Sequence, residues 1–233
     1  MPAAADGGAA AGDRGDPRRL LAATARDLYR RGWMSGTAGN LSLRLSDGSF
    51  WITASGKSKG RLTPRDFLRL GPGGEVRERP DADTAIRPSA EASLHQAVYR
   101  LFPHAAACYH VHTVAANLAS RMNPAEESGS AAGAGESSLL PLPPIEMLKG
   151  LGIWDEHPRV AIAVLPNHAH VPAIAADLET RFGADPPRLP GFLIRDHGLT
   201  VWGADAQAAL NHLELFDFIF QCMARARAAR LGW

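Results

Sequence analysis

The sequence predicts an α/β protein in which helices are layered on a largely antiparallel sheet. Short apolar segments of strand character are joined by tight turns, for example at 47–48 and 195–198. Between them lie segments whose apolar residues recur at helical spacing. Neither an internal repeat nor a linker interrupts the chain, so we expect one domain over residues 16–233.

The composition is that of a globular protein. Of 233 residues, 45% are apolar and the formal net charge is +1, which gives no support for a nucleic acid or an anionic membrane as partner. No apolar run approaches the roughly 18 residues of a membrane span. Residues 1–15 lack the apolar core of a signal peptide, and we expect a disordered tail there. Cys108 and Cys222 lie in apolar segments and indicate reduced thiols in the cytoplasm.

A helix and two strands open the domain. Asp16 is a helix N-cap, Pro17 suits the first turn, and Gly32 ends the helix. Residues 41–45 alternate between leucine and polar residues, which predicts a half-buried strand, and a second strand follows at 49–53. These strands are expected to pair through the turn between them.

The later elements follow the same reasoning. Ser89 is expected to cap a helix that precedes a short buried strand near 105–112. Residues 125–141 are rich in Gly, Ser, Ala and Glu and are expected to form a mobile insertion. The remaining expected elements are helix 114–120, strand 160–164, helix 172–182, strands 191–194 and 199–202, and a long helix 205–227.

The segment Tyr109-His110-Val111-His112-Thr113 is the first candidate for chemistry. Alternate side chains of a strand share a face, so His110 and His112 project together and Val111 projects to the other side. Two neutral imidazoles side by side form half of a metal site, and imidazole suits zinc. The competing interpretation is a pair of core or surface histidines that happen to alternate.

His197 is the candidate third ligand, because it lies in a tight turn between two strands, from which a side chain reaches a cleft. Three histidines with an open fourth position are typical of a catalytic zinc site. The alternative is that His197 only caps its turn. A rival pair, His168 and His170, stands at a helix entrance. The other histidines are interpreted as ordinary, partly exposed residues: His95, His104, His157 and His212.

Two carboxylates are candidates for acid–base chemistry. Glu91 lies in the first turn of the helix before the histidine strand, where a negative charge also favours the helix start. Glu146 follows the insertion, and a carboxylate near a metal on a movable segment suits proton transfer. The alternative for Glu146 is a solvated charge on a short helix.

Loops of small residues indicate an anion site. Hydroxyls, an amide and unhindered backbone N–H groups of this kind cradle phosphate, although Gly and Ser also form ordinary turns. Lysine and arginine side chains in or near these loops add positive charge: Lys57, Lys59 and Arg87. The candidate phosphate-binding residues include Thr37, Gly39, Asn40, Ser55, Gly56 and Ser89.

Taken together, these segments resemble the class II aldolase and adducin family. The matching motifs are Gly36-Thr37-Ala38-Gly39-Asn40-Leu41-Ser42, Ile52-Thr53-Ala54-Ser55-Gly56, Pro88-Ser89-Ala90-Glu91, His110-Val111-His112 and Arg195-Asp196-His197-Gly198. The resemblance implies a three-layer α/β/α fold and a homotetramer with active sites between subunits. It also implies one zinc ion held by His110, His112 and His197, and phosphate held by Asn40, Ser55, Gly56 and Ser89.

Within the family, the segment Glu146-Met147-Leu148-Lys149-Gly150 resembles that of members that remove water from a 5-methylthio ketose 1-phosphate in methionine salvage. That resemblance implies that Glu146 is the acid–base group. Glu91 matches the base of the family's aldolases, so a sugar-phosphate aldolase or 4-epimerase is the alternative. An adducin-like scaffold without metal is the non-enzymatic alternative, and three histidine ligands would also suit iron or manganese.

Overall fold

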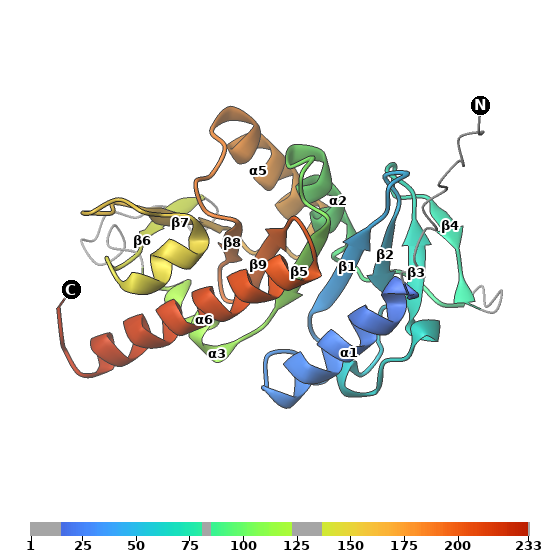
Figure 1. Ribbon diagram of the computed structural model, residues 1–233, viewed down its shortest axis with the longest axis horizontal. Coiled ribbons are helices and arrows are strands. Elements are labelled where there is room, and N and C mark those ends of the chain that lie inside the picture. The colour runs from blue at the N-terminus through green and yellow to red at the C-terminus, as the bar shows by residue number, and fades with distance from the viewer. Residues whose placement is uncertain (1–14, 81–84, 123–136, 233) are drawn as a thin grey trace, which may run out of the picture.

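The computed structural model of the chain describes residues 15–80, 85–122 and 137–232. Within these ranges the strands join in a single sheet (Figure 1). The strands are β1 (Asn40–Arg44), β2 (Phe50–Thr53), β3 (Phe67–Leu70), β4 (Val76–Glu78), β5 (Ala107–Val111), β6 (Ser138–Pro141), β7 (Ala161–Leu165), β8 (Gly191–Ile194) and β9 (Gly198–Gly203).

The order of this nine-stranded sheet is β4-β3-β2-β1-β5-β9-β8-β7-β6. Among the described strands, β7 and β8 are parallel neighbours and all other neighbours are antiparallel. The expected largely antiparallel sheet is confirmed. Strands β1, β5 and β9 lie side by side at its centre, and this arrangement brings together segments that are far apart in the sequence.

Helices cover both faces of the sheet, which confirms the three layers. One apolar core lies between the sheet and α1, α3, α6 and η4, and a second lies between the sheet and α2 and α5. The α-helices are α1 (Pro17–Arg30), α2 (Ala92–Leu101), α3 (Val114–Ala119), α5 (Val171–Ala184) and α6 (Ala206–Ala228), and the short 3-10 helices are η1 (Lys59–Arg61), η2 (Pro64–Asp66) and η4 (Glu146–Leu151).

Strand β1 differs from its expectation because both of its faces are buried. The leucines face the core under α1, and polar side chains of the opposite face meet residues of α2. Ser42, expected to face solvent, is fully buried, and its hydroxyl forms hydrogen bonds with His95 and Tyr99 of α2. A polar residue in an alternating strand therefore does not identify a solvent-facing position when hydrogen-bond partners lie opposite it.

Several boundaries also differ from expectation. Helix α2 has Glu91 at its N-cap, while the Ser89 hydroxyl accepts the backbone N–H of Glu91 at 3.3 Å. Residues 138–141, assigned to the insertion, form β6 and pair with β7. The rest of that insertion, 125–136, and nearly all of the predicted tail, 1–14, lie outside the described residues.

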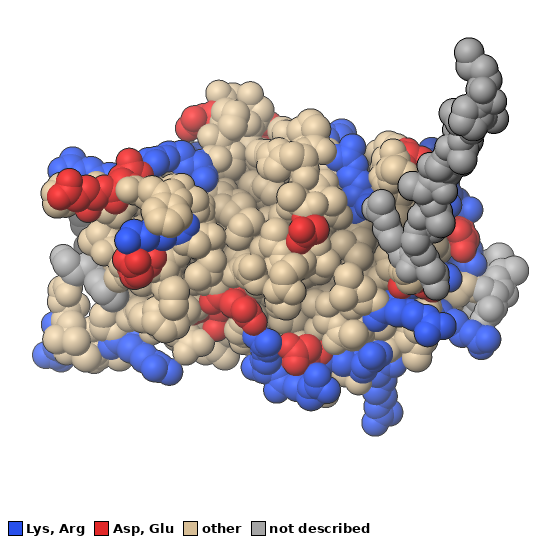
Figure 2. All heavy atoms as spheres, in the orientation of Figure 1, with Lys and Arg blue, Asp and Glu red and all other residues tan. Residues whose placement is uncertain are grey.

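The surface carries a mixture of charges. Figure 2 shows basic and acidic side chains interspersed around the periphery of one face, with few charged groups toward its centre. Among the described residues, no helix combines the length and the apolar character that crossing a bilayer demands. The surface in this view fits the nearly balanced composition.

Candidate active site

Strand β5 presents the two histidines on one face, as the alternation predicts. Tyr109 and Val111 project into the core under α1 and α6, whereas His110 and His112 project toward the N-terminus of α2. His110 is fully buried, and its Nε2 lies 2.9 Å from Nε2 of His112. The backbone N–H of His112, just beyond the strand, is fixed by the carbonyl of Trp33.

His197 reaches the pair from the turn between β8 and β9. Its ring centre lies 5.0 Å from that of His110 and 4.6 Å from that of His112. The turn has Asp196 at a positive φ of 53°, and β9 then starts at Gly198 beside β5. A Cβ at Gly198 would lie 2.3 Å from the Val111 carbonyl oxygen, so only glycine permits this close approach.

Glu91 completes a cluster of four groups. Its Oε1 lies 2.8 Å from Nε2 of His197 and 3.5 Å from Nε2 of His110. Burial alone would raise the pKa of the Glu91 carboxyl, but interaction with the neighbouring imidazoles, above all His110 and His197, lowers it well below its usual range. The carboxylate and the imidazoles therefore stabilise each other's charged forms, against the effect of burial.

The donor atoms of the cluster fit a metal ion. One ligand atom from each of Glu91, His110, His112 and His197 lies within 4.8 Å of the others. Burial lowers the pKa of His112 to about 4, which keeps the imidazole neutral as a ligand must be. Nδ1 of His110 lies 2.9 Å from the Thr200 hydroxyl, an outer partner that directs Nε2 into the cluster. Three imidazoles and a carboxylate are ligands that suit zinc, iron or manganese.

The small-residue loops form a pocket beside the cluster. It has a volume of about 270 Å³ and includes Glu91 and His112 in its wall. Gly39 and Gly56 take positive φ values of 77° and 70°, which glycine alone adopts easily. Residues from all the candidate phosphate loops line it: Thr37, Ala38, Gly39, Asn40, Ala54, Ser55, Gly56, Ser89 and Ala90.

Lys59 also lines this pocket, with a side chain that is only 2% exposed. Its ammonium donates to the carbonyl oxygens of Thr37 at 2.6 Å and Lys57 at 3.0 Å. Burial lowers the pKa of Lys59, and the charge of Glu91 opposes that change. Lys57 instead pairs with Asp66 at 3.7 Å, and Arg87 is exposed. Of the three basic residues considered, Lys59 is the one that faces the site.

Glu146 is not among the residues that line this pocket. It lies in η4, which packs against α6, and its side chain is 80% exposed with Lys149 as partner at 2.9 Å. Within this single chain, Glu91 is the carboxylate that lies with the histidines. The acid–base role of Glu146 stays a prediction.

Among the residues that the structure describes, the rival histidine pair does not meet further metal ligands. His168 pairs with Asp177 at 2.8 Å, and His170 is exposed at the N-cap of α5. His104 and His157 are exposed, and His212 is partly buried with its Nδ1 on the Trp202 carbonyl. His95 contradicts its interpretation as a partly exposed residue, because it is fully buried beneath the site.

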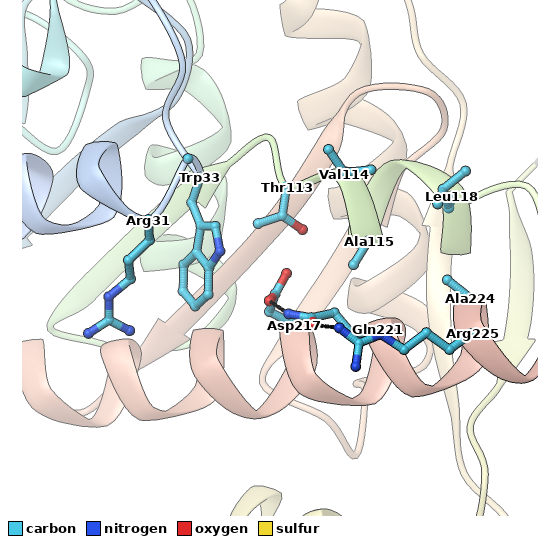
Figure 3. Close-up of a pocket in the computed structure, with 11 residues that line it drawn as sticks. Arg31, Trp33, Thr113, Val114, Ala115, Leu118, Asp217, Gln221, Ala224 and Arg225 are labelled. Carbon is cyan, nitrogen blue, oxygen red and sulfur yellow. Dashed lines mark hydrogen bonds between the residues drawn. The ribbon is translucent and has the colours of Figure 1, made fainter.

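A second cavity, of about 360 Å³, lies between α1, α3 and α6 (Figure 3). Trp33, Thr113 and Asp217 face it, and Gln221 donates a hydrogen bond to the Asp217 carboxylate at 2.6 Å. Its wall includes none of the four cluster residues. The candidate active site is therefore the smaller pocket beside the histidines.

A family model described as Class II Aldolase and Adducin N-terminal domain matches residues 19–224. The chain belongs to the class II aldolase and adducin family. A methylthioribulose-1-phosphate dehydratase of Microcystis aeruginosa is 52% identical over 211 residues, which are 91% of this chain and 96% of that protein. A protein of the same name from Leptospira biflexa is 43% identical over 202 residues, 84% of this chain and 91% of its own length.

Solved structures show the same fold. YgbL of Escherichia coli superposes with a TM-score of 0.70 at 24% identity, covering 90% of this chain and 89% of that chain. The L-fuculose-1-phosphate aldolase of Thermus thermophilus superposes with a TM-score of 0.66 at 25% identity, covering 90% of this chain and 93% of that chain. These likenesses confirm the class II aldolase-like fold.

Proposed function

We propose that this chain removes water from 5-methylthioribulose 1-phosphate to give 2,3-diketo-5-methylthiopentyl 1-phosphate, a reaction of methionine salvage. The observation that carries the proposal is the cluster of Glu91 and three histidines, which opens on a pocket lined by small-residue loops. The relatives that share 52% and 43% identity over most of their length are named for this reaction. The enzyme is then a lyase.

Zinc is the proposed metal, one ion per subunit, held by His110, His112 and His197. When bound, it supplies a Lewis acid that polarises the substrate oxygens and makes the C3 hydrogen more acidic. Burial keeps His112 neutral for this task, and Thr200 orients His110.

The substrate phosphate is proposed to lie against the loops that carry Ser55, Gly56 and Ser89. Unhindered N–H groups and hydroxyls suit an anion there. Asn40, which borders the same pocket, is also proposed to bind the phosphate, and the Lys59 ammonium adds a fixed positive charge to the pocket wall. Binding at this end would orient the C2–C4 part of the substrate toward the cluster.

The reaction needs a carboxylate to move a proton. The base takes the C3 proton, and the electron pair of that bond forms an enediolate across C2 and C3. The C4–O bond then breaks, and the hydroxyl leaves as water with a proton from the same group or from a second carboxylate. The enol at C3 and C4 ketonises to the diketone. Glu146 remains the proposed base, and Glu91 is the second carboxylate.

The proposed assembly is a homotetramer with active sites between subunits. Glu146 is 80% exposed on its own chain and is absent from the wall of that chain's pocket. In such a tetramer, Glu146 is supplied by a neighbouring copy. The proposed location is the cytoplasm, where the two cysteines, which form no disulfide with each other, stay reduced.

A substrate panel tests the proposal. The purified, metal-analysed protein is offered methylthioribulose 1-phosphate, fuculose 1-phosphate and ribulose 5-phosphate, and the products are followed by mass. Loss of one water from the first substrate is expected. An aldehyde plus dihydroxyacetone phosphate from the second would overturn the dehydratase and make the protein an aldolase, and epimerised ribulose 5-phosphate would make it a 4-epimerase.

Aldol cleavage is the second candidate because of Glu91. Its carboxylate lies 2.8 Å from His197, in the position expected of an aldolase base. A scaffold without catalysis is disfavoured by the converging histidines, and a folded protein that binds no metal would support it.

A further inference from the structure

A buried chain of hydrogen bonds connects helix α2 and strand β1 with the active-site carboxylate. The Tyr99 hydroxyl lies 2.7 Å from the Ser42 hydroxyl, which lies 2.6 Å from Nδ1 of His95. Nε2 of His95 lies 2.5 Å from Oδ1 of Asn40. Nδ2 of Asn40 donates to Oε2 of Glu91, whose other oxygen faces His197.

The spacing of these residues explains why they meet. Glu91, His95 and Tyr99 are four residues apart along α2, so they share one face of the helix. Asn40 and Ser42 are two residues apart on β1 and share the face that α2 covers. Asn40, Ser42 and His95 are at most 1% exposed, and Tyr99 is 5% exposed. In this environment each polar atom needs a partner.

The orientation of the Asn40 amide sets the direction of the hydrogen bonds in the chain. Its Nδ2 faces Oε2 of Glu91, and since an amide NH₂ only donates, the carboxylate oxygen is the acceptor. Oδ1 of Asn40 then faces His95, and since an amide oxygen only accepts, Nε2 of His95 carries a proton. The protonation of His95 thus follows from the geometry at Glu91.

The other nitrogen of His95 completes the pattern. Burial lowers the pKa of His95 to about 4, against an opposing effect of Glu91, so the ring is neutral at neutral pH. Nδ1 is therefore an acceptor, the Ser42 hydroxyl donates to it, and the Tyr99 hydroxyl donates to Ser42. The chain has one consistent direction from Tyr99 to Glu91.

We propose that His95 is a positioning residue that, as its Nε2–H tautomer, holds the Asn40 amide in one orientation and thereby fixes the Glu91 carboxylate against His197 and His110. Asn40 then contacts Glu91 with its side chain and lines the proposed phosphate pocket as well. A flipped Asn40 would turn its oxygen toward the carboxylate and leave two acceptors in contact. The catalytic consequence of this proposal depends on the proposed role of Glu91, whereas the orientation itself does not.

Neutron diffraction from perdeuterated, metal-loaded crystals tests the orientation directly. The expected result is deuterium on Nε2 and none on Nδ1 of His95, with the ND₂ group of Asn40 facing Glu91. Deuterium on Nδ1 alone, or an Asn40 oxygen facing Glu91, would overturn the proposal. Because no reaction is followed, this result does not depend on which substrate the enzyme uses.

Kinetics of two substitutions test the consequence. His95→Leu removes the donor, while His95→Gln offers an amide N–H near the position of Nε2. His95→Leu is expected to lower kcat by roughly 10- to 100-fold with KM nearly unchanged, the size expected for loss of a hydrogen bond in a chain that ends on a charge. His95→Gln is expected to restore most of kcat.

Tyr99→Phe is the matched control, because it removes the far end of the chain and leaves His95, Asn40 and Glu91 in place. It is expected to lower the unfolding midpoint with kcat within about threefold of wild type. Equal kcat for His95→Leu and wild type, or a kcat that falls in all three variants only in step with their stability, would assign the chain to stability alone and overturn the positioning role. If His95→Leu does not fold, the Gln variant and the neutron result still decide.

Discussion

Lys59 is a buried cation held by neutral oxygens. Its ammonium donates to two carbonyls, and among the described residues no carboxylate lies within ion-pair distance. A buried charge is costly unless a group of opposite charge offsets it. The pocket lined by Ser55 and Ser89 is open to such a group, and a substrate phosphate would supply it.

Replacing Lys59 with Met is therefore expected to weaken phosphate binding while leaving the cluster intact. A charged hydrogen bond contributes about 1.5–3 kcal/mol, so KM and the inhibition constant of inorganic phosphate should rise by roughly 10- to 100-fold. Lys57→Met is the matched control, since Lys57 pairs with Asp66 at 3.7 Å. Equal inhibition of both variants by phosphate would remove Lys59 from the phosphate site.

Substitution with Gln distinguishes the role of Glu146 from that of Glu91. Glu146→Gln should lower kcat by about two decades or more, with bound metal unchanged, because the group that moves the proton is lost. Glu91→Gln is expected to change metal content as well, since Glu91 lies among the histidine nitrogens. Turnover and metal per subunit are measured on both. Full turnover by Glu146→Gln would eliminate Glu146 as the base.

At the scale of elements, strand alternation and turn chemistry predicted most of what builds the site. The faces of β5, the turn before β9 and the helix that begins near Glu91 were all predictable from spacing. Strands β3 and β4 were not predicted; β4 has only three residues and lies at the edge of the sheet, and β3 lies beside it. The burial of His95 was also missed, since a lone histidine in a helix gives no signal of what covers it.

Gly198 is the point at which β9 approaches the histidine strand most closely. A Cβ there would lie 2.3 Å from the Val111 carbonyl oxygen. It would also lie 3.2 Å from one ring carbon of His110 and 3.2 Å from one ring carbon of His112. Gly198→Ala should therefore displace β9 and His197, destabilise the protein by about 1–3 kcal/mol, and reduce metal content.

Gly183→Ala is the control for that substitution, because a Cβ at Gly183, in α5, would meet nothing within 4 Å. It should leave metal content unchanged and raise stability by up to about 1 kcal/mol. Metal content is measured on the purified variants and stability by urea unfolding. A Gly198→Ala protein with full metal content and unchanged stability would contradict the role given to this contact.

At the scale of the molecule, the order of the sheet assembles the site. Neighbouring β1, β5 and β9 bring residues 37–40, 110–112 and 197 together, and the loops at 54–59 and 89–91 close the pocket. Periodicity alone does not reveal which distant segments meet. The resemblance to the class II aldolase family did predict which segments meet, because the family's motifs recur here in order. The match over residues 19–224 shows that the chain belongs to that family.

The central claim is that the protein dehydrates its substrate at the cluster of Glu91 and three histidines. The most direct test asks whether water loss depends on this cluster and its metal. Metal-loaded wild type, chelator-stripped protein and His112→Ala are each incubated with methylthioribulose 1-phosphate, and the product is followed by mass. Wild type is expected to yield the substrate minus one water, with turnover lost on stripping, restored by added zinc, and absent in a folded His112→Ala protein. Water loss that persists in both stripped protein and His112→Ala would contradict dehydration at this cluster.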